Sequence, residues 1–198
     1  MKLGVELKRN IFHMLMGVLI VILLLLKIIG KMHIFFLIVV AISIAFLKKK
    51  HEIPPIDLAL KHFERPKNLK TFPGKGVIFY LIGVFLTLSF FPLDIAMPAI
   101  MVLAFADPIS HFFGTRFGKI AHPLTTKKFI EGMIAGMIAG FLGALIFVPW
   151  PQALAASFFA MIAEGIEMKI GPGRVDDNVI IPLVAAAAIW AIRFLASM

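Results

Sequence analysis

One stretch of the chain changes abruptly from apolar to charged side chains. In LAFADPISHFFGTRFGK, residues 103–119, an apolar run ends at Asp107 and is followed by two glycines, an arginine and a lysine. Glycine lets backbone N–H groups approach an anion closely, and Arg and Lys add charge-assisted hydrogen bonds to phosphate oxygens. A nearby carboxylate can hold Mg²⁺, which usually binds one or two carboxylates together with substrate phosphates. The stretch predicts a phosphate site; a positively charged loop with turn glycines is the alternative.

The residues that follow extend this predicted site. Lys127 and Lys128 precede the next apolar run, and Glu131 stands at its start, where a helix N-terminus offers the positive end of its dipole. The chain contains neither the P-loop pattern nor the glycine-rich loop of protein kinases, so the site is of another kind. The predicted nucleotide-binding residues are Gly114, Arg116, Gly118, Lys119, Lys127, Lys128, Glu131 and Asn178.

A second acidic cluster, AEGIEMKIGPGRVDDNVIIPL, lies near the C-terminus. Glu164 closes one apolar run, and Asp176 and Asp177 open the next. One acid at a helix N-terminus is ordinary capping. Two acids followed by an asparagine, close to Glu164 and Glu167, indicate a metal site instead. The predicted Mg²⁺ ligands are Asp107, Glu164, Asp176 and Asp177.

A third group of polar residues lies in ELKRNIFHMLMG, near the N-terminus. Glu6, Arg9, His13 and Gly17 follow one another at helical spacing and therefore share one helix face. A carboxylate, a cation and an imidazole in line on an apolar helix predict a polar pocket. The alternative is a basic membrane-entry segment with a histidine packed among helices.

The elements that must position these residues belong to a membrane protein. Of the 198 residues 61% are hydrophobic and only 16% are charged, and the mean hydropathy is +0.99. The chain has no cysteine, which excludes a disulfide framework, a thiol nucleophile and a cysteine metal site. The net charge of +9 comes from short basic clusters between apolar runs, a pattern that excludes nucleic acid as a partner.

The apolar runs predict an all-α, polytopic membrane helix bundle with about seven transmembrane helices, in one domain over residues 1–198. The first run looks like a signal peptide but lacks a cleavage site, so we expect it to be a retained span. The runs are Ile11–Leu26, Ile34–Leu47, Val77–Phe91, Ile95–Ala106, Ile130–Trp150, Ala153–Ala163 and Val179–Leu195.

The distribution of Lys and Arg predicts the orientation. With the N-terminus in the cytoplasm, all of them except Lys27, Lys31 and Arg193 fall on the inner segments. The predicted phosphate and metal sites then lie on the cytoplasmic face. The basic loop 48–76 is also cytoplasmic and contains a short amphipathic helix at Ile56–Phe63, which we expect to lie in the membrane interface. A lid or a phosphate-binding surface is the alternative for this loop.

Glycines recur at every fourth position of one apolar run. Gly132, Gly136 and Gly140 have the small-xxx-small spacing that favours close helix packing. The spacing permits a homodimer without requiring one. The alternative is a groove for an isoprenoid or acyl chain, which makes Gly136 and Gly140, together with Glu6, Arg9 and His13, predicted residues of a lipid pocket.

These motifs together resemble the membrane CTP-using superfamily, which contains phosphatidate cytidylyltransferases and CTP-dependent polyprenol, dolichol, phytol and diacylglycerol kinases. The resemblance covers almost the whole chain, and its first and last motifs are similar to the kinase branch. The motifs are E-L-K-R-N-I-F-H at 6–13, Asp107 with G-T-R-F-G at 114–118, K-K-F-I-E-G at 127–132, and Glu164 with D-D-N-V-I-I-P-L at 176–183.

The resemblance implies a membrane kinase that phosphorylates the hydroxyl of an isoprenoid or lipid alcohol, with CTP as the donor and Mg²⁺ as the cofactor. It implies catalytic roles for Asp107, Asp177 and Lys128, and either His13 or a carboxylate as the base. The alternative within the superfamily is a CDP-lipid synthase, in which a lipid phosphate attacks the α-phosphate of CTP. A small transporter or a structural membrane protein is the alternative outside it.

Overall fold

The computed structural model describes residues 3–48, 51–64, 68–69, 72–125, 128–166, 169–170 and 173–198, and these are mostly helical. Each of the seven predicted apolar runs forms a helix, and a further helix covers the predicted Ile56–Phe63. The helices are α1 (Leu3–Leu25), α2 (Lys31–Lys48), α3 (Pro54–Phe63), α5 (Lys75–Phe90), α6 (Leu93–Phe117), α7 (Ile130–Leu145), α8 (Trp150–Gly165) and α9 (Asp177–Ala196). The antiparallel strands β1 (Lys169–Ile170) and β2 (Gly173–Arg174) lie between α8 and α9.

Within the described residues, four helices are long and apolar enough to cross a membrane: α1, α2, α6 and α9. The helices α5 and α7 are apolar but shorter. A helix needs about 20 residues to cross the hydrocarbon core. The helix lengths therefore indicate an integral membrane protein, and the prediction of seven crossings is not confirmed.

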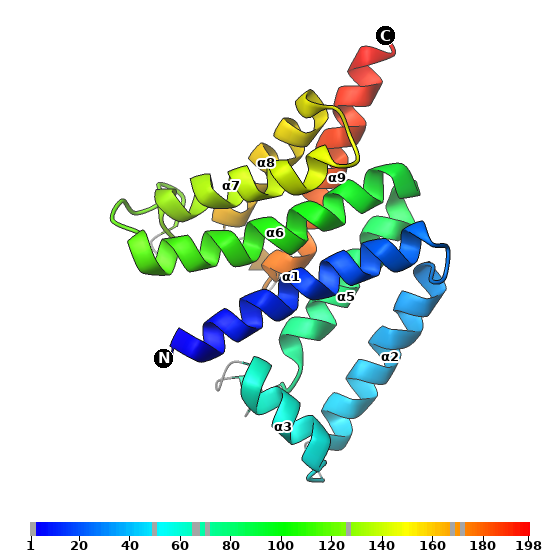
Figure 1. The fold of residues 1–198 in the computed structure, drawn as a ribbon, viewed down its shortest axis with the longest axis vertical. Coiled ribbons are helices and arrows are strands. Elements are labelled where there is room, and N and C mark those ends of the chain that lie inside the picture. Colours follow the sequence, from blue (N-terminus) through cyan, green and yellow to red (C-terminus); the bar gives the residue numbers. More distant parts are fainter. Residues whose placement is uncertain are drawn as a thin grey trace.

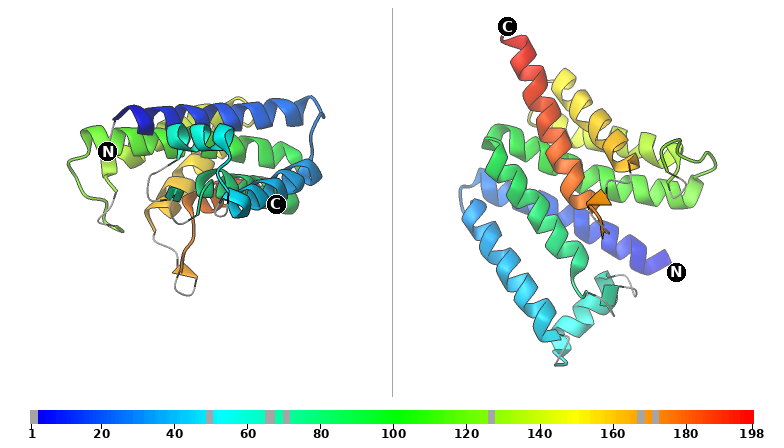
Figure 2. Two further views of the ribbon diagram at one scale, coloured as in Figure 1. Left: turned by 90° about the horizontal axis from the view of Figure 1, so that it is seen from below. Right: turned by 180° about the vertical axis from the view of Figure 1, so that it is seen from behind.

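The helices form two crossed layers (Figures 1 and 2). In one layer α6 lies between α1 and α7, and in the other α2, α5, α9 and α8 follow one another. The helix α6 also contacts α5, α8 and α9, so it is the central helix of the fold. Its residues from Ala99 to Ala104 are all buried, and they form the middle of the apolar core.

The prediction that a helix ends before Asp107 is wrong. Helix α6 continues to Phe117, so Asp107 lies in its interior and Gly114 is helical. Pro108 removes one helical hydrogen bond, but packing against the neighbouring helices holds the helix together beyond it. The Asn10 side chain of α1 donates to the Pro108 carbonyl oxygen at 3.2 Å.

Glycines set the close approach of α7 to α6. A Cβ at Gly132 would lie 2.6 Å from the Ser110 carbonyl oxygen and 3.0 Å from the Gly114 Cα. A Cβ at Gly136 would lie 2.7 Å from the Ser110 Cβ. The predicted helix-packing role of this glycine series agrees with these contacts, which bring the start of α7 beside the C-terminal part of α6.

Candidate functional site

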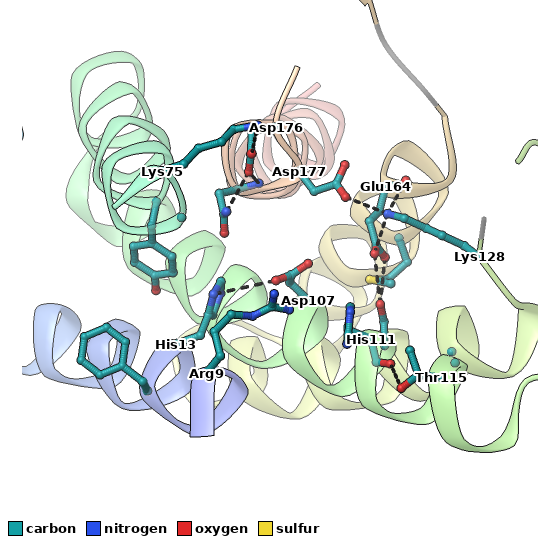
Figure 3. Close-up of a pocket in the computed structure, with 18 of the residues that line it drawn as sticks. Arg9, His13, Lys75, Asp107, His111, Thr115, Lys128, Glu164, Asp176 and Asp177 are labelled. Atoms are coloured by element: carbon teal, nitrogen blue, oxygen red, sulfur yellow. Dashed lines mark hydrogen bonds and ion pairs between the residues drawn. The ribbon is translucent and has the colours of Figure 1, made fainter. Parts of the chain in front are cut away.

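A cavity of about 470 Å³ lies between the two layers. Its walls come from α1, α5 and α6, from the end of α8 and from the starts of α7 and α9. Charged side chains surround it (Figure 3): Lys75 and Asp176 on one side, Asp177, Glu164 and Lys128 on another, and Arg9, His13, Asp107 and His111 along a third. A cavity of this size is typical of small-molecule sites.

Three carboxylates converge in this cavity. Asp107 of α6, Glu164 at the end of α8 and Asp177 at the start of α9 each offer an oxygen, and these oxygens lie within 4.8 Å of one another. The Lys128 ammonium reaches the same place, with its Nζ 2.8 Å from Glu164 Oε1 and 2.9 Å from Asp177 Oδ2. When all four groups are ionised, the three carboxylates and the ammonium have a net charge of −2, which matches the charge of a divalent cation.

Glu164 is the most deeply buried acid of the cluster, with only 4% of its surface exposed. Ser110 Oγ donates to it at 3.0 Å, and Lys128 Nζ also donates to its backbone carbonyl oxygen at 2.8 Å. Burial raises the pKa of Glu164 to about 7; Lys128 acts against this rise, and the charges of Asp107 and Asp177 add to it. The protein therefore supplies too little positive charge to hold Glu164 fully ionised at neutral pH.

Lys128 is held as a cation by the same acids. Burial alone would lower the pKa of Lys128, but the charges and hydrogen bonds of Glu164 and Asp177 raise it above its usual value. Its side chain is 23% exposed and lies at the end of the loop before α7. It can therefore remain charged while it donates to carboxylates or to phosphate oxygens.

The donor set fits Mg²⁺. Oxygen ligands from one or a few carboxylates, completed by phosphate oxygens, are what this ion uses in phosphoryl-transfer sites. Asp107, Glu164 and Asp177 supply such oxygens on three separate helices, and the surplus negative charge of the cluster needs a cation. These three residues would hold the metal.

His13 faces Asp107 across the cavity. His13 Nε2 lies 3.3 Å from the Leu103 carbonyl oxygen, which can only accept, so this nitrogen carries the proton and donates. When the ring is neutral, Nδ1 is an acceptor, and it lies 3.8 Å from Asp107 Oδ2. A hydroxyl placed beside this pair can donate its one proton to His13 Nδ1 or to Asp107 Oδ2.

The remaining polar residues of α1 form a chain beside this pair. Arg9 contacts Glu6 at 3.0 Å, and His111 of α6 lies 3.7 Å from the same Glu6 carboxylate. Arg9, His13 and His111 line the cavity, whereas Glu6 supports Arg9 and His111 from behind. The shared helix face predicted from the sequence therefore reaches the cavity.

Asp176 lies outside the three-carboxylate cluster. It is the N-cap of α9, and its Oδ1 accepts from the Asn178 N–H at 3.3 Å and from Asn178 Nδ2 at 2.8 Å. Lys75 of α5 approaches its other oxygen at 3.6 Å. Asn178 also lines the cavity, and its buried Oδ1 has no hydrogen-bond partner among the described residues. The ordinary capping function explains Asp176, and Asp177 is the acid that points to the cluster.

Several predicted nucleotide-binding residues do not line the cavity. Arg116, Gly118 and Lys119 lie at the far end of α6, and the Glu131 carboxylate accepts from the backbone N–H groups of Lys119 and Ile120 at 3.0 and 3.1 Å. Glu131 therefore holds the loop after α6 in place. The predicted glycine cradle is wrong for Gly114, which lines the cavity from within a helix and packs on Gly132. Lys127 lies outside the described residues.

The predicted lipid pocket at Gly136 and Gly140 is also wrong. Neither glycine lines the cavity, and α6 and α8 fill the space beside them. A Cβ at Gly140 would lie 3.1 Å from the Ala106 Cβ and 3.4 Å from the Ser157 Cβ. These glycines pack helices and leave no room for a hydrocarbon chain.

The structure adds residues that sequence reasoning missed. Lys75, Tyr80 and Ser110 line the cavity. Tyr80 is the only tyrosine of the chain, and it is fully buried with its ring edge-to-face on His13 at 4.6 Å. A single tyrosine in an apolar run was a signal available from the sequence. Lys75 is one of several basic residues in its segment, and Ser110 is one of several small ones, so the sequence did not single out either of them.

Comparisons with known proteins agree with this chemistry. The chain is 28% identical over 134 residues to CTP-dependent diacylglycerol kinase 1 of Schizosaccharomyces pombe, covering 59% of this chain and 60% of that protein. It is 22% identical over 148 residues to the protein of the same name in Saccharomyces cerevisiae, covering 62% of this chain and 49% of that protein. The chain thus spans less than two thirds of the length of these kinases.

A relative in Methanocaldococcus jannaschii, the uncharacterized protein MJ1137, matches more of the chain. It is 30% identical over 151 residues, which cover 75% of this chain and 73% of that protein. No family model and no solved structure matches the chain. The predicted resemblance to CTP-dependent lipid kinases is confirmed, because the chain is a homologue of the CTP-dependent diacylglycerol kinases. The chain belongs to the same family as MJ1137.

Proposed function

We propose that the protein is a membrane kinase that transfers the γ-phosphate of CTP to the hydroxyl of a lipid alcohol. The observation that carries this proposal is the cluster of Asp107, Glu164, Asp177 and Lys128 in a cavity between apolar helices. Phosphoryl transfer depends chiefly on positioning and on neutralising charge, and this cluster can do both.

Asp107, Glu164 and Asp177 would hold Mg²⁺, which would supply positive charge to neutralise the triphosphate oxygens and stabilise the transition state. Lys128 lies close enough to these carboxylates to turn its ammonium toward the same phosphate oxygens. Arg9 and Lys75 place two further cations on the cavity wall. The protein thus surrounds the triphosphate with cations from α1, α5 and the loop before α7.

His13 and Asp107 receive the lipid hydroxyl. The hydroxyl lies beside Asp107 and donates its one proton to His13 Nδ1, which lies 3.8 Å from Asp107 Oδ2. Its oxygen attacks the γ-phosphorus, the bond from that phosphorus to the β-γ bridging oxygen breaks, and CDP leaves. The hydroxyl proton passes to His13 Nδ1, because Nε2 is occupied by the Leu103 carbonyl oxygen.

The relatives favour diacylglycerol as the first alcohol to test, since they are named as diacylglycerol kinases. An isoprenoid alcohol of the dolichol, polyprenol or phytol type is the second. Both carry a hydroxyl at the polar end of long hydrocarbon chains, and the hydroxyl is the only part that the His13–Asp107 pair must recognise. We place the site on the cytoplasmic side, where the Lys and Arg distribution puts the inner loops.

The test uses purified protein in detergent micelles with Mg²⁺ and CTP carrying radioactive phosphorus at either the α or the γ position. We expect γ-label, and no α-label, on diacylglycerol or an isoprenoid alcohol. Phosphatidate is the control acceptor: α-label on this lipid would identify a CDP-lipid synthase and contradict the kinase. Failure to label any of these lipids would contradict both enzymes and leave a transporter or a structural protein.

A further inference from the structure

Four apolar residues from neighbouring segments line the cavity: Phe12 and Met16 of α1, Phe63 at the end of α3 and Val77 of α5. The rings of Phe12 and Phe63 contact each other with their centroids 5.0 Å apart. Phe12 is 36% exposed and Phe63 is 38% exposed, so both side chains line the cavity and are also accessible at the protein surface. We call this pair the aromatic portal.

Other residues that line the cavity also reach the surface. Among the described lining residues, Phe12, Phe63 and Thr115 are exposed, and the Lys75 side chain is 38% exposed. Thr115 lies beside His111 in α6, at a polar part of the wall (Figure 3). The aromatic portal is therefore the apolar exit among the described residues. Because α1 is one of the helices that could cross a membrane, an exit beside it opens towards lipid.

Helix α3 packs outside the apolar core. No α3 side chain is buried, and α3 packs on α1. Its first turn is held by Asp57, which accepts from the Ile53 N–H and forms an ion pair with Lys48. Glu64 directly follows the last residue of α3. Its carboxylate accepts hydrogen bonds from Asn68 Nδ2 at 2.8 Å and from the Gly76 N–H at 3.4 Å. The helix is thus tied at both ends and loosely packed between them.

One face of α1 matches an amphiphile. Arg9, Phe12, His13 and Met16 line the cavity at helical spacing, so the polar His13 adjoins the apolar Phe12 and Met16. A lipid whose hydroxyl lies beside His13 and Asp107 can therefore place its chains along Phe12 and Met16. Exposed apolar residues such as Leu15 and Leu19 continue along α1 beyond the portal. The glycines of α7 offer no comparable path, because α6 and α8 fill the space beside them.

We propose that the hydrocarbon chains of the lipid alcohol leave the cavity between α1 and α3, through the aromatic portal of Phe12 and Phe63. The identity of the lipid rests on the proposed function, and the aromatic portal is the part of the protein that the lipid chains contact. The portal admits the alcohol sideways from the bilayer, while its hydroxyl reaches His13 and Asp107.

A photoactivatable lipid tests the portal without catalysis. Purified protein receives a diacylglycerol that carries a diazirine at mid-chain, is irradiated without CTP, and is digested for mass spectrometry. We expect the label on Phe12, Met16 or Phe63, and competition by unmodified diacylglycerol. Label confined to α7 around Gly136, or label that misses both α1 and α3, would overturn the portal. Because no CTP is present, portal labelling in a protein that fails the kinase assay would contradict the proposed function alone.

A reversible cross-link tests whether the portal must open. The chain has no cysteine, so F12C/F63C carries the only two thiols. A bismaleimide with a reducible disulfide arm closes the portal. We expect the phosphorylation rate of long-chain diacylglycerol to fall at least tenfold and to return after reduction, while CTP affinity changes less than twofold. The matched control is W190C/F194C, because these stacked residues lie one turn apart on α9, away from the cavity. Full activity of the cross-linked F12C/F63C protein would overturn the portal.

Discussion

At the scale of single residues, Asp176 and Asp177 are adjacent in the sequence but have different environments. Asp176 caps α9, whereas Asp177 contacts Lys128 and belongs to the three-carboxylate cluster. Asn caps a helix about as well as Asp does. We therefore expect Asp176→Asn to keep the kinase rate within about threefold of the wild-type rate. Asp177→Asn should lower it by a factor on the order of 100 or more, because a ligand of the metal is lost.

The measurement is the initial rate of phosphate transfer to diacylglycerol at saturating CTP, with the thermal unfolding midpoint of each variant as the folding control. The assignment of Asp177 fails if both asparagine variants lose activity to the same degree while remaining folded.

The raised pKa of Glu164 predicts how metal affinity depends on pH. A proton and Mg²⁺ compete for the Glu164 carboxylate, and its pKa is about 7 in the metal-free protein. Above that pH the carboxylate is already ionised and the affinity is constant. Below it the affinity should fall by up to about tenfold per pH unit.

Calorimetric titration with Mg²⁺ between pH 5.5 and pH 8.5 measures this dependence. In Glu164→Gln the affinity should be lower at all pH values and should lose its change near pH 7. An affinity of the wild-type protein that stays constant through this range would contradict the role of Glu164 as a ligand.

The sequence predicted which acids to consider, because Asp107, Glu164 and Asp177 each adjoin an apolar run at the same predicted side of the bundle. The structure brings these three within 4.8 Å, while their binding of a metal stays a prediction. Sequence spacing could not separate Asp177 from Asp176, since only the direction of the first turn of α9 decides which carboxylate enters the cluster. Sequence spacing also could not show that the Glu131 carboxylate accepts a hydrogen bond from the Lys119 backbone N–H, because the two residues meet only after folding.

At the scale of elements, the crossing of α5 and α9 sets the position of Asp177. A Cβ at Gly83 of α5 would overlap the backbone carbonyl oxygen of Asn178 and lie 3.2 Å from the Val179 Cα. Gly83→Ala must therefore push the start of α9 away, at a cost of about 1–3 kcal/mol. We expect the unfolding midpoint to fall by at least about 2 °C, and the kinase rate to fall because Asp177 moves.

Gly30→Ala is the matched control, because a Cβ at Gly30 would meet nothing within 4 Å. Differential scanning fluorimetry and the rate assay compare the two variants. Unchanged stability and rate in Gly83→Ala would show that the contact of α5 with α9 does not position the site.

The helices themselves were largely predictable, because each apolar run is long enough to indicate a helix. The position at which α6 ends was not predictable. A run of polar residues with a proline usually ends a helix, but Asn10 of α1 and the glycines of α7 hold α6 in a helix as far as Phe117. Such support comes from residues far away in the sequence, and local patterns do not contain it. The portal was unpredictable for the same reason, since Phe12 and Phe63 meet only after folding.

At the scale of the whole molecule, the charge distribution predicts which side of the membrane each loop faces. Lys61 and Lys119 are exposed on predicted inner segments, and Lys31 is exposed on a predicted outer one. Because the chain has no cysteine, Lys61→Cys, Lys119→Cys and Lys31→Cys each carry a single thiol. We expect a membrane-impermeant maleimide added outside intact spheroplasts to label Lys31→Cys alone.

Inverted vesicles provide the complementary control, in which Lys61→Cys and Lys119→Cys should react and Lys31→Cys should not. Labelling of Lys61→Cys and Lys119→Cys from the outside would reverse the proposed orientation and place the site on the other face.

The central claim concerns the whole molecule, because α1, α5, α6, α8 and α9 each bring a cavity residue to the proposed reaction. The most direct measurement is the identity of the nucleotide product. Purified protein with Mg²⁺ and CTP is added to vesicles that contain both diacylglycerol and phosphatidate, and the soluble products are identified by mass spectrometry. Transfer of the γ-phosphate predicts CDP, formed in equal amount to newly phosphorylated diacylglycerol and absent with Asp177→Asn. Pyrophosphate with CDP-diacylglycerol would contradict the account, as would the absence of any lipid-dependent product after an isoprenoid alcohol has also been added to the vesicles.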